Sequence, residues 1–532
     1  MVETISQSPL GLNIGRNIQN IRGKKIIYSF WVIVISFAVS QSVFADPKKK
    51  PNVIYIYASD LGRGLLSAYG QAHFTTPNID ALINGGVSFS NAYGGTLTAF
   101  ARASLFTGYH DCRKNKWYIE KGGIHIREDT SQVNDSESFI NRNAVLLPED
   151  DYYLAQIFQK AGYVTGQIGK LGIGNMSTRQ QMKRYGWDYF YGFLDLFHSR
   201  GYYPPFLFEN DQTVMIEGNT LQNGGAGLVP ENENAYKDRW NMEGKKTYAP
   251  DLFVNKIIDF LREFKDMPFF LMYSTPLPQG PVSVPAVHPE IAGNGALTQV
   301  EKEYASMVKL LDDQVGIIMN ELRALNLEDN TLVVFSSDNG HELHYLQEGR
   351  LERPLINKKT KETFDNIFNK YYSANAGDIF NGNAGLAGLK NSNLEGGIRI
   401  PLTFYWKGKL KTGVRTETVA GYDLLPTMAE MTGIRLKTKK DGISYLPLLT
   451  KGKKLPKNRY VILGSAEGPV MITNEGWKLR YYKNSKQYEL YNLKKDPEEK
   501  YNVILRFPDI AEKIKKTLLE ECNGNIDNGI FY

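Results

Sequence analysis

The sequence predicts an α/β protein with a central, mostly parallel sheet flanked by helices, followed by a small C-terminal antiparallel sheet with one helix. Two observations support this prediction. Between residues 52 and 431, apolar runs typical of buried strands alternate with segments whose apolar residues recur at helical spacing, and this alternation indicates a doubly wound sheet. From about Asn458 the pattern changes, because short apolar runs alternate with turns before one amphipathic segment.

The strands and helices of the first region follow one another along the chain. Residues 52–58 form a continuous apolar, β-rich run, as in a buried parallel strand. A Pro in the first turn opens a short helix after Thr76, and paired glycines close it at 85–86. Further helices are expected over 151–161, 251–264, 299–325 and 423–431, and further strands over 163–168, 269–273, 331–335 and 402–406.

The second region predicts a smaller subdomain. Short runs typical of antiparallel strands, and then one helix, are expected at 461–463, 470–473, 478–482, 488–491 and 509–519. The predicted organisation is a leader with a signal peptide over 1–45, an α/β domain over 46–457 and an α+β subdomain over 458–532.

The first 45 residues have the order of parts found in a secretory leader. Lys24 and Lys25 precede an apolar run over 26–39, and Ala45 ends the stretch that follows. Cleavage after Ala45 would export the protein to the periplasm or the medium and leave it without a stable membrane span. The alternative is a retained anchor, since residues 26–45 are uncharged and just long enough to cross a bilayer.

Composition narrows the choice of partners. The 532 residues carry a formal charge of +6, with 42% apolar and 23% charged residues, as in soluble globular proteins. The longest Lys/Arg block is 48–50, which argues against a nucleic-acid partner, while the mild positive charge suits anionic substrates. The two cysteines, Cys112 and Cys522, permit one disulfide in an exported protein, and two separate thiols are the equal alternative.

Thr98 and Arg102 are the first candidate site residues. Thr98 precedes a helix-compatible run, so its hydroxyl is expected at a helix N-terminus, where the dipole and free N–H groups favour an oxyanion. Arg102, one turn later, would present its guanidinium to the same anion. The alternative for Thr98 is a simple N-cap.

Two acidic loops suggest a metal site. Asp60 follows the strand at 52–58, and Asp338 and Asn339 follow the strand at 331–335, at the sheet edge where ligands bind in open α/β folds. Carboxylate and amide oxygens suit Ca²⁺ or Mg²⁺, and ordinary turn chemistry is the alternative.

Cations and histidines near these loops add candidates. Lys170 directly follows a strand, and Lys390 precedes a Glu-Gly-Gly segment; the alternative for each lysine is a solvated loop side chain. His341 and His344 are candidate metal ligands or general acids, with polar surface residues as the default interpretation. Residues 341–389 are rich in Asn and Gly and are expected to form a surface loop over the site.

Taken together, these segments resemble the sulfatase family within the alkaline-phosphatase-like superfamily. The matching motifs keep the family's order from about Pro51 to Asn502. They are Pro51-Asn52-Val53 through Leu61-Gly62, Thr76-Pro77-Asn78-Ile79-Asp80, Gly86 through Tyr93, Arg102 through His110, Gly162-Tyr163 with Gly169-Lys170, Ser337 through Gly340, Glu395 through Pro401, and Tyr488 through Leu493 with Asp496-Pro497-Glu498. The resemblance implies the family's α/β domain and four-stranded C-terminal subdomain.

The resemblance also implies a chemistry. Sulfatases oxidise a Cys or Ser to formylglycine, whose hydrate attacks the sulfate ester while one divalent cation, usually Ca²⁺, neutralises sulfate oxygens. His110 fits a Thr-Gly-x-His form of a bacterial branch and is expected among the catalytic residues. The metal ligands of the family match Asp60, Asp338 and Asn339, and its residues that bind formylglycine and sulfate match Arg102, Lys170 and Lys390.

Four positions depart from the family's pattern. Thr98 stands where the formylglycine precursor is expected and cannot become formylglycine, and Phe100 replaces the family's Pro. Ser59 replaces the first Asp of the metal loop and weakens the cation site, and Leu277 replaces a His. The expected function is therefore that of a protein of sulfuric ester hydrolase type, which acts on or binds sulfate esters of glycans with its formylglycine turnover impaired.

Three versions of that function remain open. The first is hydrolysis of sulfated glycans by an altered mechanism, and the second is non-catalytic binding of sulfated saccharides through Arg102, Lys170 and Lys390. The third is a phosphoesterase with Thr98 as nucleophile. The seven histidines of the chain argue against the third version, since such relatives need a two-zinc site rich in Asp and His.

Overall fold

The structure is a computed structural model, which describes residues 50–113, 151–172, 179–194, 198–220, 238–346 and 348–530. The predicted leader and signal peptide over 1–45 lie outside the described residues. Among the described helices, none is long and apolar enough to cross a membrane.

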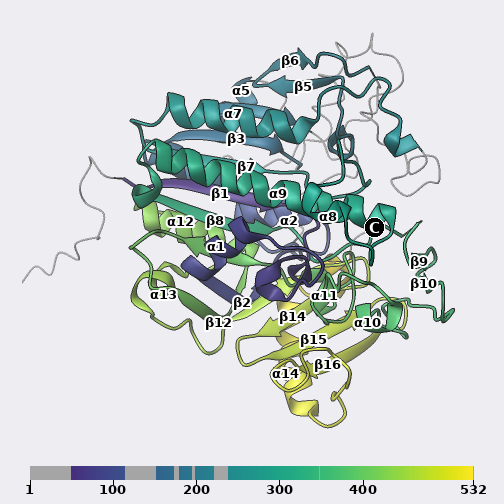
Figure 1. Cartoon of the computed structure of the whole chain (residues 1–532). Helices are drawn as coiled ribbons and strands as arrows, with labels where there is room; N and C mark the ends of the chain where they lie inside the picture. The colour runs from purple at the N-terminus through teal and green to yellow at the C-terminus, as the bar shows by residue number, and fades with distance from the viewer. Residues whose placement is uncertain are drawn as a thin grey trace, which may run out of the picture. The chain divides into compact units, whose positions relative to one another are not determined.

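A ten-stranded mixed sheet lies at the centre of the fold (Figure 1). Its order in space is β12-β2-β11-β8-β1-β7-β3-β4-β5-β6. Only β11 and β5 run opposite to the other strands of this sheet, which confirms the predicted α/β class with a mostly parallel sheet. The strands are β1 (Asn52–Ala58), β2 (Val87–Tyr93), β3 (Val164–Lys170), β4 (Tyr189–Phe193), β5 (Phe206–Glu209), β6 (Gln212–Met215), β7 (Phe269–Ser274), β8 (Thr331–Ser337), β11 (Leu402–Tyr405) and β12 (Gly413–Ala420).

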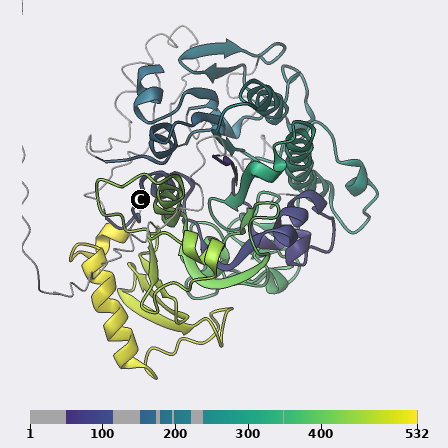
Figure 2. The same ribbon diagram turned by 90° about the vertical axis from the view of Figure 1, so that its left-hand side faces the viewer.

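Helices cover both faces of this sheet (Figures 1 and 2). On one face α1, α7 and α9 pack together, and on the other α2, α4 and α12 do so. The apolar spacing that predicts α7 is explained by burial, because Phe253, Ile257 and Phe260 all face the core. The helices are α1 (Pro77–Gly85), α2 (Thr98–Thr107), α4 (Leu154–Lys160), α5 (Arg179–Arg184), α7 (Ala249–Glu263), α8 (Pro289–Ala292), α9 (Gln299–Ala324), α10 (Ser373–Ala376), α11 (Glu395–Ile398), α12 (Leu424–Thr432), α13 (Leu446–Lys451) and α14 (Pro508–Glu521).

A separate four-stranded antiparallel sheet with α14 follows, as the sequence predicts. Its strands, in spatial order, are β13 (Tyr460–Leu463), β14 (Val470–Thr473), β15 (Trp477–Tyr482) and β16 (Gln487–Asn492). Cys112 and Cys522 lie in the apolar cluster beneath this sheet as free thiols. Residues 48–532 form one compact unit, and the boundary at 457 stays a sequence prediction.

Buried ion pairs join the C-terminal sheet to α11. Lys478 Nζ lies 3.0 Å from Glu395 Oε1 and 2.9 Å from Glu499 Oε1, with all three side chains fully buried. Removing one partner of such a cluster would leave an uncompensated charge in the interior. The C-terminal sheet therefore helps to fix α11, which follows the segment that carries Lys390.

The segment over 341–389 is packed more closely than its Asn- and Gly-rich composition predicts. It contains a short hairpin of β9 (Leu351–Glu352) and β10 (Ile356–Asn357). Its aromatic side chains Phe364, Tyr371 and Phe380 are buried in the main core. The Asn and Gly residues turn the chain between these anchors, so the predicted surface loop is for the most part a folded segment.

Candidate active site

The carboxyl ends of β1 and β8 bring the predicted metal loops together. The two strands are parallel neighbours in which Ala58 lies opposite Ser337, so the loops that follow meet at one edge of the sheet. Asp60 N donates to Asp338 Oδ1 at 2.9 Å, and Asn339 Nδ2 donates to Asp60 Oδ1 at 3.0 Å. The structure thus places the three predicted metal ligands in one buried cluster.

Thr98 opens α2 beside this cluster. It is the first residue of the helix, and the N-cap is Leu97, so the alternative that Thr98 is a simple N-cap is wrong. The Thr98 hydroxyl donates to Asn339 Oδ1 at 3.4 Å, next to the predicted ligands. An oxyanion here would meet the N–H groups of the first helical turn and the positive end of the helix dipole.

Arg102 is fully buried one turn into α2. Its guanidinium donates to Ser59 Oγ at 3.2 Å and pairs with Asp338 Oδ2 at 3.5 Å. It also donates to Ser274 Oγ and lies over the Tyr57 ring, 4.8 Å from the ring centroid. The guanidinium therefore connects the ends of β1, β7 and β8 to α2, and it holds a permanent positive charge at this edge.

Lys390 reaches the same cluster from the segment before α11. Its Nζ lies 2.7 Å from Asp60 Oδ2, and His344 Nε2 lies 3.2 Å from the same oxygen. Burial would raise the pKa of Asp60, but the Lys390 ammonium and the His344 hydrogen bond outweigh burial and hold that pKa well below its usual range. Burial would lower the pKa of Lys390, yet the Asp60 carboxylate raises it above its usual range. The two side chains therefore form an ion pair in which Asp60 is buried and Lys390 is half-buried.

Lys170 is the last residue of β3, and its Nζ donates to Gln279 Oε1 at 2.5 Å. Burial, followed by the nearby Arg102 guanidinium, lowers the pKa of Lys170 well below its usual range. An anion that enters the site would favour the protonated form of this lysine.

Sequence reasoning misses Gln279 and assigns His344 to the surface, where it does not lie. The His344 ring is buried, 6.2 Å from the Tyr304 ring centroid. His341 is buried as well, which lowers its pKa to about 4. The sequence signal for Gln279 is its place in the loop after β7, since β7 ends at the same sheet edge as β1 and β8.

Leu277 lies in that loop with its side chain fully buried. Its carbonyl accepts a hydrogen bond from Ser59 N at 3.0 Å, so it contributes a backbone contact and no acid. The polar side chain that the loop contributes is the amide of Gln279.

The structure does not bring His110 to the site. The ten residues of α2 separate His110 from Thr98 by about 15 Å along the helix axis. His110 Nε2 lies 3.1 Å from Glu521 Oε2 and 3.5 Å from Asp441 Oδ2. The prediction that His110 lies with the catalytic residues is therefore wrong in position, because the residue follows the opposite end of the helix.

The same three side chains form a group of possible metal ligands in the described part of the chain. Arg113 Nε lies 3.0 Å from Asp441 Oδ1, and Arg113 also pairs with Glu521. Because one guanidinium neutralises both carboxylates, we interpret this group as an ion-pair cluster that attaches α14, and not as a metal centre.

Comparison with known proteins decides the family. A family model described as "Sulfatase" matches residues 51–434, and one described as "N-sulphoglucosamine sulphohydrolase, C-terminal" matches residues 390–524. The chain belongs to the sulfatase family. This confirms the resemblance that the ordered motifs indicate.

Similar sulfatases cover most of the chain. The N-acetylgalactosamine-6-O-sulfatase of Bacteroides thetaiotaomicron is 27% identical over 88% of this chain and 93% of its own. Arylsulfatase A of Bos taurus is 25% identical over 91% of this chain and 88% of its own. A solved structure from a study of glycosaminoglycan metabolism by Bacteroides thetaiotaomicron has a TM-score of 0.65 and 23% identity, and covers 89% of this chain and 100% of its own. The phosphonate monoester hydrolase of Agrobacterium radiobacter shares the fold with a TM-score of 0.54 and 19% identity, over 88% of this chain and 95% of its own.

Sulfatases generally bind a divalent metal, and the residues of this site fit one. Asp60, Asp338 and Asn339 offer carboxylate and amide oxygens in one buried cluster, a donor set that suits a hard cation. Ser59 offers only a hydroxyl, which donates to Thr275 O at 2.9 Å. This sulfatase-family site therefore has two carboxylates where the family pattern has three.

Gly340, directly after the ligand pair, has no room for a side chain. A Cβ at this position would lie 2.0 Å from Gly396 O, because the metal loop packs directly on α11. We expect Gly340→Ala to lower the free energy of unfolding by about 2 kcal/mol, as overpacking does elsewhere. Urea denaturation measures the loss. Gly293→Ala, where no atom lies within 4 Å of the added Cβ, is the matched control, and an equal loss in both variants would contradict the packing argument.

His198 makes the fold sensitive to acid. Its ring packs between Phe193 and Phe206, with centroid distances of 5.0 and 4.7 Å, and burial lowers its pKa to about 4. The unfolded chain, with a histidine pKa of about 6.5, binds the proton first as the pH falls, so stability is lost progressively from about pH 6.5 to about pH 4. We expect this residue to account for a loss of about 2 kcal/mol between pH 7 and pH 5.

Urea denaturation at pH 7 and pH 5 measures this loss in the wild type and in His198→Gln. The variant should show a smaller difference between the two pH values, since Gln does not titrate. An unchanged difference would show that other groups cause the acid sensitivity.

Proposed function

We propose that this sulfatase-family protein binds sulfate esters of glycans at the carboxyl edge of its sheet and does not hydrolyse them by the formylglycine route. The proposal is supported by the position of Thr98, which the order of the family's motifs predicts to be that of the nucleophile, and by the basic side chains of Arg102, Lys170 and Lys390 around the cluster beside it. The substrate class is supported by relatives named N-acetylgalactosamine-6-O-sulfatase and N-acetylgalactosamine-6-sulfatase.

Thr98 cannot be converted to formylglycine, and its hydroxyl donates to an amide and not to a base. Its Cβ carries a methyl group, so oxidation would give a ketone and not the aldehyde of formylglycine. An unmodified hydroxyl needs a neighbouring base or a bound metal ion to attack, and the Thr98 hydroxyl donates here to the amide oxygen of Asn339. An amide oxygen does not accept a proton at neutral pH. The seven histidines of the chain disfavour a phosphoesterase with Thr98 as nucleophile, since such relatives need a two-zinc site rich in Asp and His.

The charges around Thr98 favour binding of a sulfate group. Arg102 contributes a planar guanidinium that suits sulfate oxygens, and pairing with Asp60 raises the pKa of Lys390. Burial is the main cause of the lowered pKa of Lys170, and a bound anion would raise that pKa again. A sulfate would then meet three cations against the two carboxylates of Asp60 and Asp338.

We assign one divalent cation, Ca²⁺, to Asp60, Asp338 and Asn339. When bound there, it would supply two further positive charges beside the sulfate oxygens. Because Ser59 provides no carboxylate, we expect Ca²⁺ to bind more weakly than at a site with three carboxylates. The predicted signal peptide favours a periplasmic or secreted protein, which would meet glycans outside the cytoplasm.

Calorimetry of the full chain with N-acetylgalactosamine 6-sulfate, in the presence of Ca²⁺, tests the binding. N-acetylgalactosamine is the matched ligand without sulfate. Release of sulfate from the same sugar and from an aryl sulfate, and release of phosphate from an aryl phosphate, test turnover. We expect binding of the sulfated sugar alone and no release of either anion.

Lys390→Gln tests the pocket, since it removes one cation from beside Asp60. We expect at least about tenfold weaker binding of the sulfated sugar, whereas Lys516→Gln on the exposed face of α14 should leave it unchanged. Equal binding of the two sugars would contradict sulfate recognition. Sulfate release that is lost in Thr98→Ala would contradict the loss of turnover, and phosphate release that is lost in the same variant would establish the phosphoesterase instead.

A further inference from the structure

One surface outside the active site is strongly basic. Residues 407–457 contain twelve Lys or Arg and four Asp or Glu residues, a net charge of +8, whereas the whole chain carries +6. The rest of the chain is therefore slightly acidic, at −2. Ten of the twelve cations are exposed, and they lie in three segments, 407–411, 435–439 and 451–457. We call these three segments the basic face.

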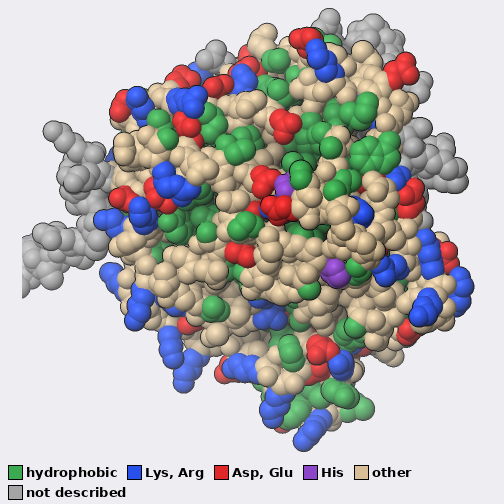
Figure 3. All heavy atoms as spheres, in the orientation of Figure 1, with side chains coloured by type: hydrophobic (Ala, Val, Ile, Leu, Met, Phe, Trp, Pro, Cys, Tyr) green, Lys and Arg blue, Asp and Glu red, His purple; other side chains and the backbone are tan. Residues whose placement is uncertain are grey.

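The basic face lies outside the active site, and its first segment lies at the opposite sheet edge. The segment 407–411 follows β11, which ends beside the start of β8, where Tyr405 pairs with Val333. The segment 435–439 follows α12, which begins after the carboxyl end of β12 and returns along the sheet. The segment 451–457 follows α13, which packs against α12. Figure 3 shows Lys and Arg side chains gathered at the left and lower left of the described surface, over α12, α13 and β12 of Figure 1.

The second segment presents its cations to solvent. Arg435, Lys437 and Lys439 are exposed, and Leu436 and Thr438 between them are half-buried. The chain lies outside any strand here and bends at Lys437 and Thr438. Three exposed cations within five residues suit a linear polyanion, which carries its own charges at intervals along one chain.

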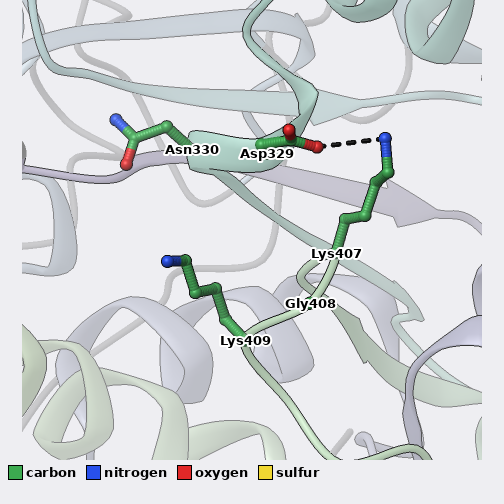
Figure 4. A pocket seen from close by; sticks show the side chains of 5 residues that line it. All are labelled: Asp329, Asn330, Lys407, Gly408 and Lys409. Atoms are coloured by element: carbon green, nitrogen blue, oxygen red, sulfur yellow. Dashed lines mark ion pairs between the residues drawn. The ribbon is translucent and has the colours of Figure 1, made fainter.

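Acidic side chains neutralise only a small part of the face. Lys407 Nζ lies 3.0 Å from Glu328 Oε2 and 3.0 Å from Asp329 Oδ1. An open hollow at the start of β8 is lined by Asp329, Asn330, Lys407, Gly408 and Lys409 (Figure 4). Within the hollow Lys407 pairs with Asp329, while Lys409 forms no ion pair with the residues drawn. The ammonium group of Lys409 is thus open to an anion from outside.

The hollow is no part of the active site. Asp329 and Asn330 precede β8, whereas Asp338 and Asn339 follow it, so the seven residues of the strand separate the two places by about 23 Å. A single sulfate group bound in the active site cannot also contact the hollow. A polymer with many sulfate groups can contact both places at once.

We propose that the basic face binds a sulfated polysaccharide away from the active site and holds the protein on its polymeric substrate. The sulfated nature of the polymer rests on the proposed function, whereas its polyanionic character follows from the face alone. Clustered surface charge of one sign raises the local concentration of an oppositely charged ligand. An anionic membrane is the competing partner, but faces that bind membranes also insert large apolar side chains. The large exposed hydrophobic side chains of the described residues all lie outside the three segments.

Binding of the full chain to immobilised heparin, a sulfated polysaccharide, tests the proposal. The triple variant Lys409→Glu, Lys439→Glu and Lys453→Glu changes one exposed lysine in each segment. We expect its dissociation constant for heparin to rise about tenfold at 0.1 M salt.

A second triple variant, Lys494→Glu, Lys495→Glu and Lys516→Glu, makes the same change in net charge after β16 and on α14. We expect it to bind heparin within about twofold of the wild type, because distant surface charges are largely screened at this ionic strength. Equal weakening by both variants would overturn the proposal, since net charge alone would then explain the binding. Vesicles with phosphatidylglycerol are the third probe, and binding to them that exceeds binding to heparin and is lost only in the first variant would replace the polysaccharide with a membrane.

Binding of the monosaccharide and of heparin by the same variants distinguishes a failure of this proposal from a failure of the proposed function. The variant of the basic face should bind N-acetylgalactosamine 6-sulfate as the wild type does, because its three substitutions lie outside the active site. Lys390→Gln should lose binding of the monosaccharide and keep binding of heparin. Loss of heparin binding in Lys390→Gln would place the polymer in the active site and overturn the proposal.

Discussion

Thr98→Cys combined with Phe100→Pro is expected to turn this protein into an active sulfatase when it is co-expressed with formylglycine-forming machinery. The pair restores the Cys-x-Pro-x-Arg pattern around Arg102, which the family uses to form its nucleophile. Both positions lie in the first turn of α2, and the helical hydrogen bonds begin only with Ala101 N to Leu97 O. Proline is tolerated in a first turn for this reason. We expect sulfate release from an aryl sulfate to rise about 10³-fold or more, since the nucleophile dominates catalysis of this kind.

Two controls separate the nucleophile from other causes. The same double variant produced without the formylglycine-forming machinery should stay inactive, because a cysteine thiol is not the aldehyde hydrate. Thr98→Ala with Phe100→Pro should also stay inactive in the presence of the machinery. Mass spectrometry of the tryptic peptide reports the conversion of Cys to formylglycine. Full conversion without activity would show that the site has lost more than its nucleophile, with Ser59 as the first residue to restore.

The parts of this site that follow strands could be predicted from local sequence. A buried apolar run predicts a parallel strand, and the carboxyl ends of parallel neighbours meet at one edge, which is why Asp60 comes to lie beside Asp338. The edge strands were harder to predict. The start of β12 is exposed or half-buried, so its sequence does not show the alternation of apolar and polar residues that indicates a strand. All four residues of β6 are exposed or half-buried.

Contacts between segments far apart in the chain could not be predicted. His344 reaches Asp60 because the segment after β8 folds back onto the loop that holds Gly280, where a Cβ would lie 2.2 Å from His344 Nδ1. No local pattern contains that packing. His110 is predicted to lie at the site, because it belongs to a family motif. The motif does not say which end of α2 faces the site, and His110 follows the far end. Lys170 and Lys390 could be chosen among the many lysines of the chain only through the order of the family's motifs.

Ser59→Asp is expected to raise the affinity of this protein for Ca²⁺ by about 100-fold, because the number of carboxylates strongly tunes such sites. The Ser59 side chain is buried next to Asp60 in the chain, and its Oγ lies 3.2 Å from an Arg102 nitrogen. A carboxylate here would join Asp60 and Asp338 at the same sheet edge. In the absence of Ca²⁺, three buried carboxylates would face two paired cations, which costs stability. The variant should therefore melt at a lower temperature in EDTA than the wild type and gain several degrees when Ca²⁺ is added, since a ligand at 100 times its dissociation constant adds about 2.7 kcal/mol.

Ser59→Asn is the matched control, because Asn has the size of Asp without its charge. Calorimetry with Ca²⁺ and melting curves with and without EDTA should show a gain for Asp and none for Asn. An equal response of the two variants would mean that the size of the side chain at position 59, and not its charge, controls the affinity for Ca²⁺. A Ser59→Asp protein with the wild-type affinity would mean that Asp60, Asp338 and Asn339 do not hold the cation, and that the ion pairs of Asp60 with Lys390 and of Asp338 with Arg102 have taken its place. The charge at position 59 therefore decides between a weakened metal site and a pocket that binds sulfate with its own cations.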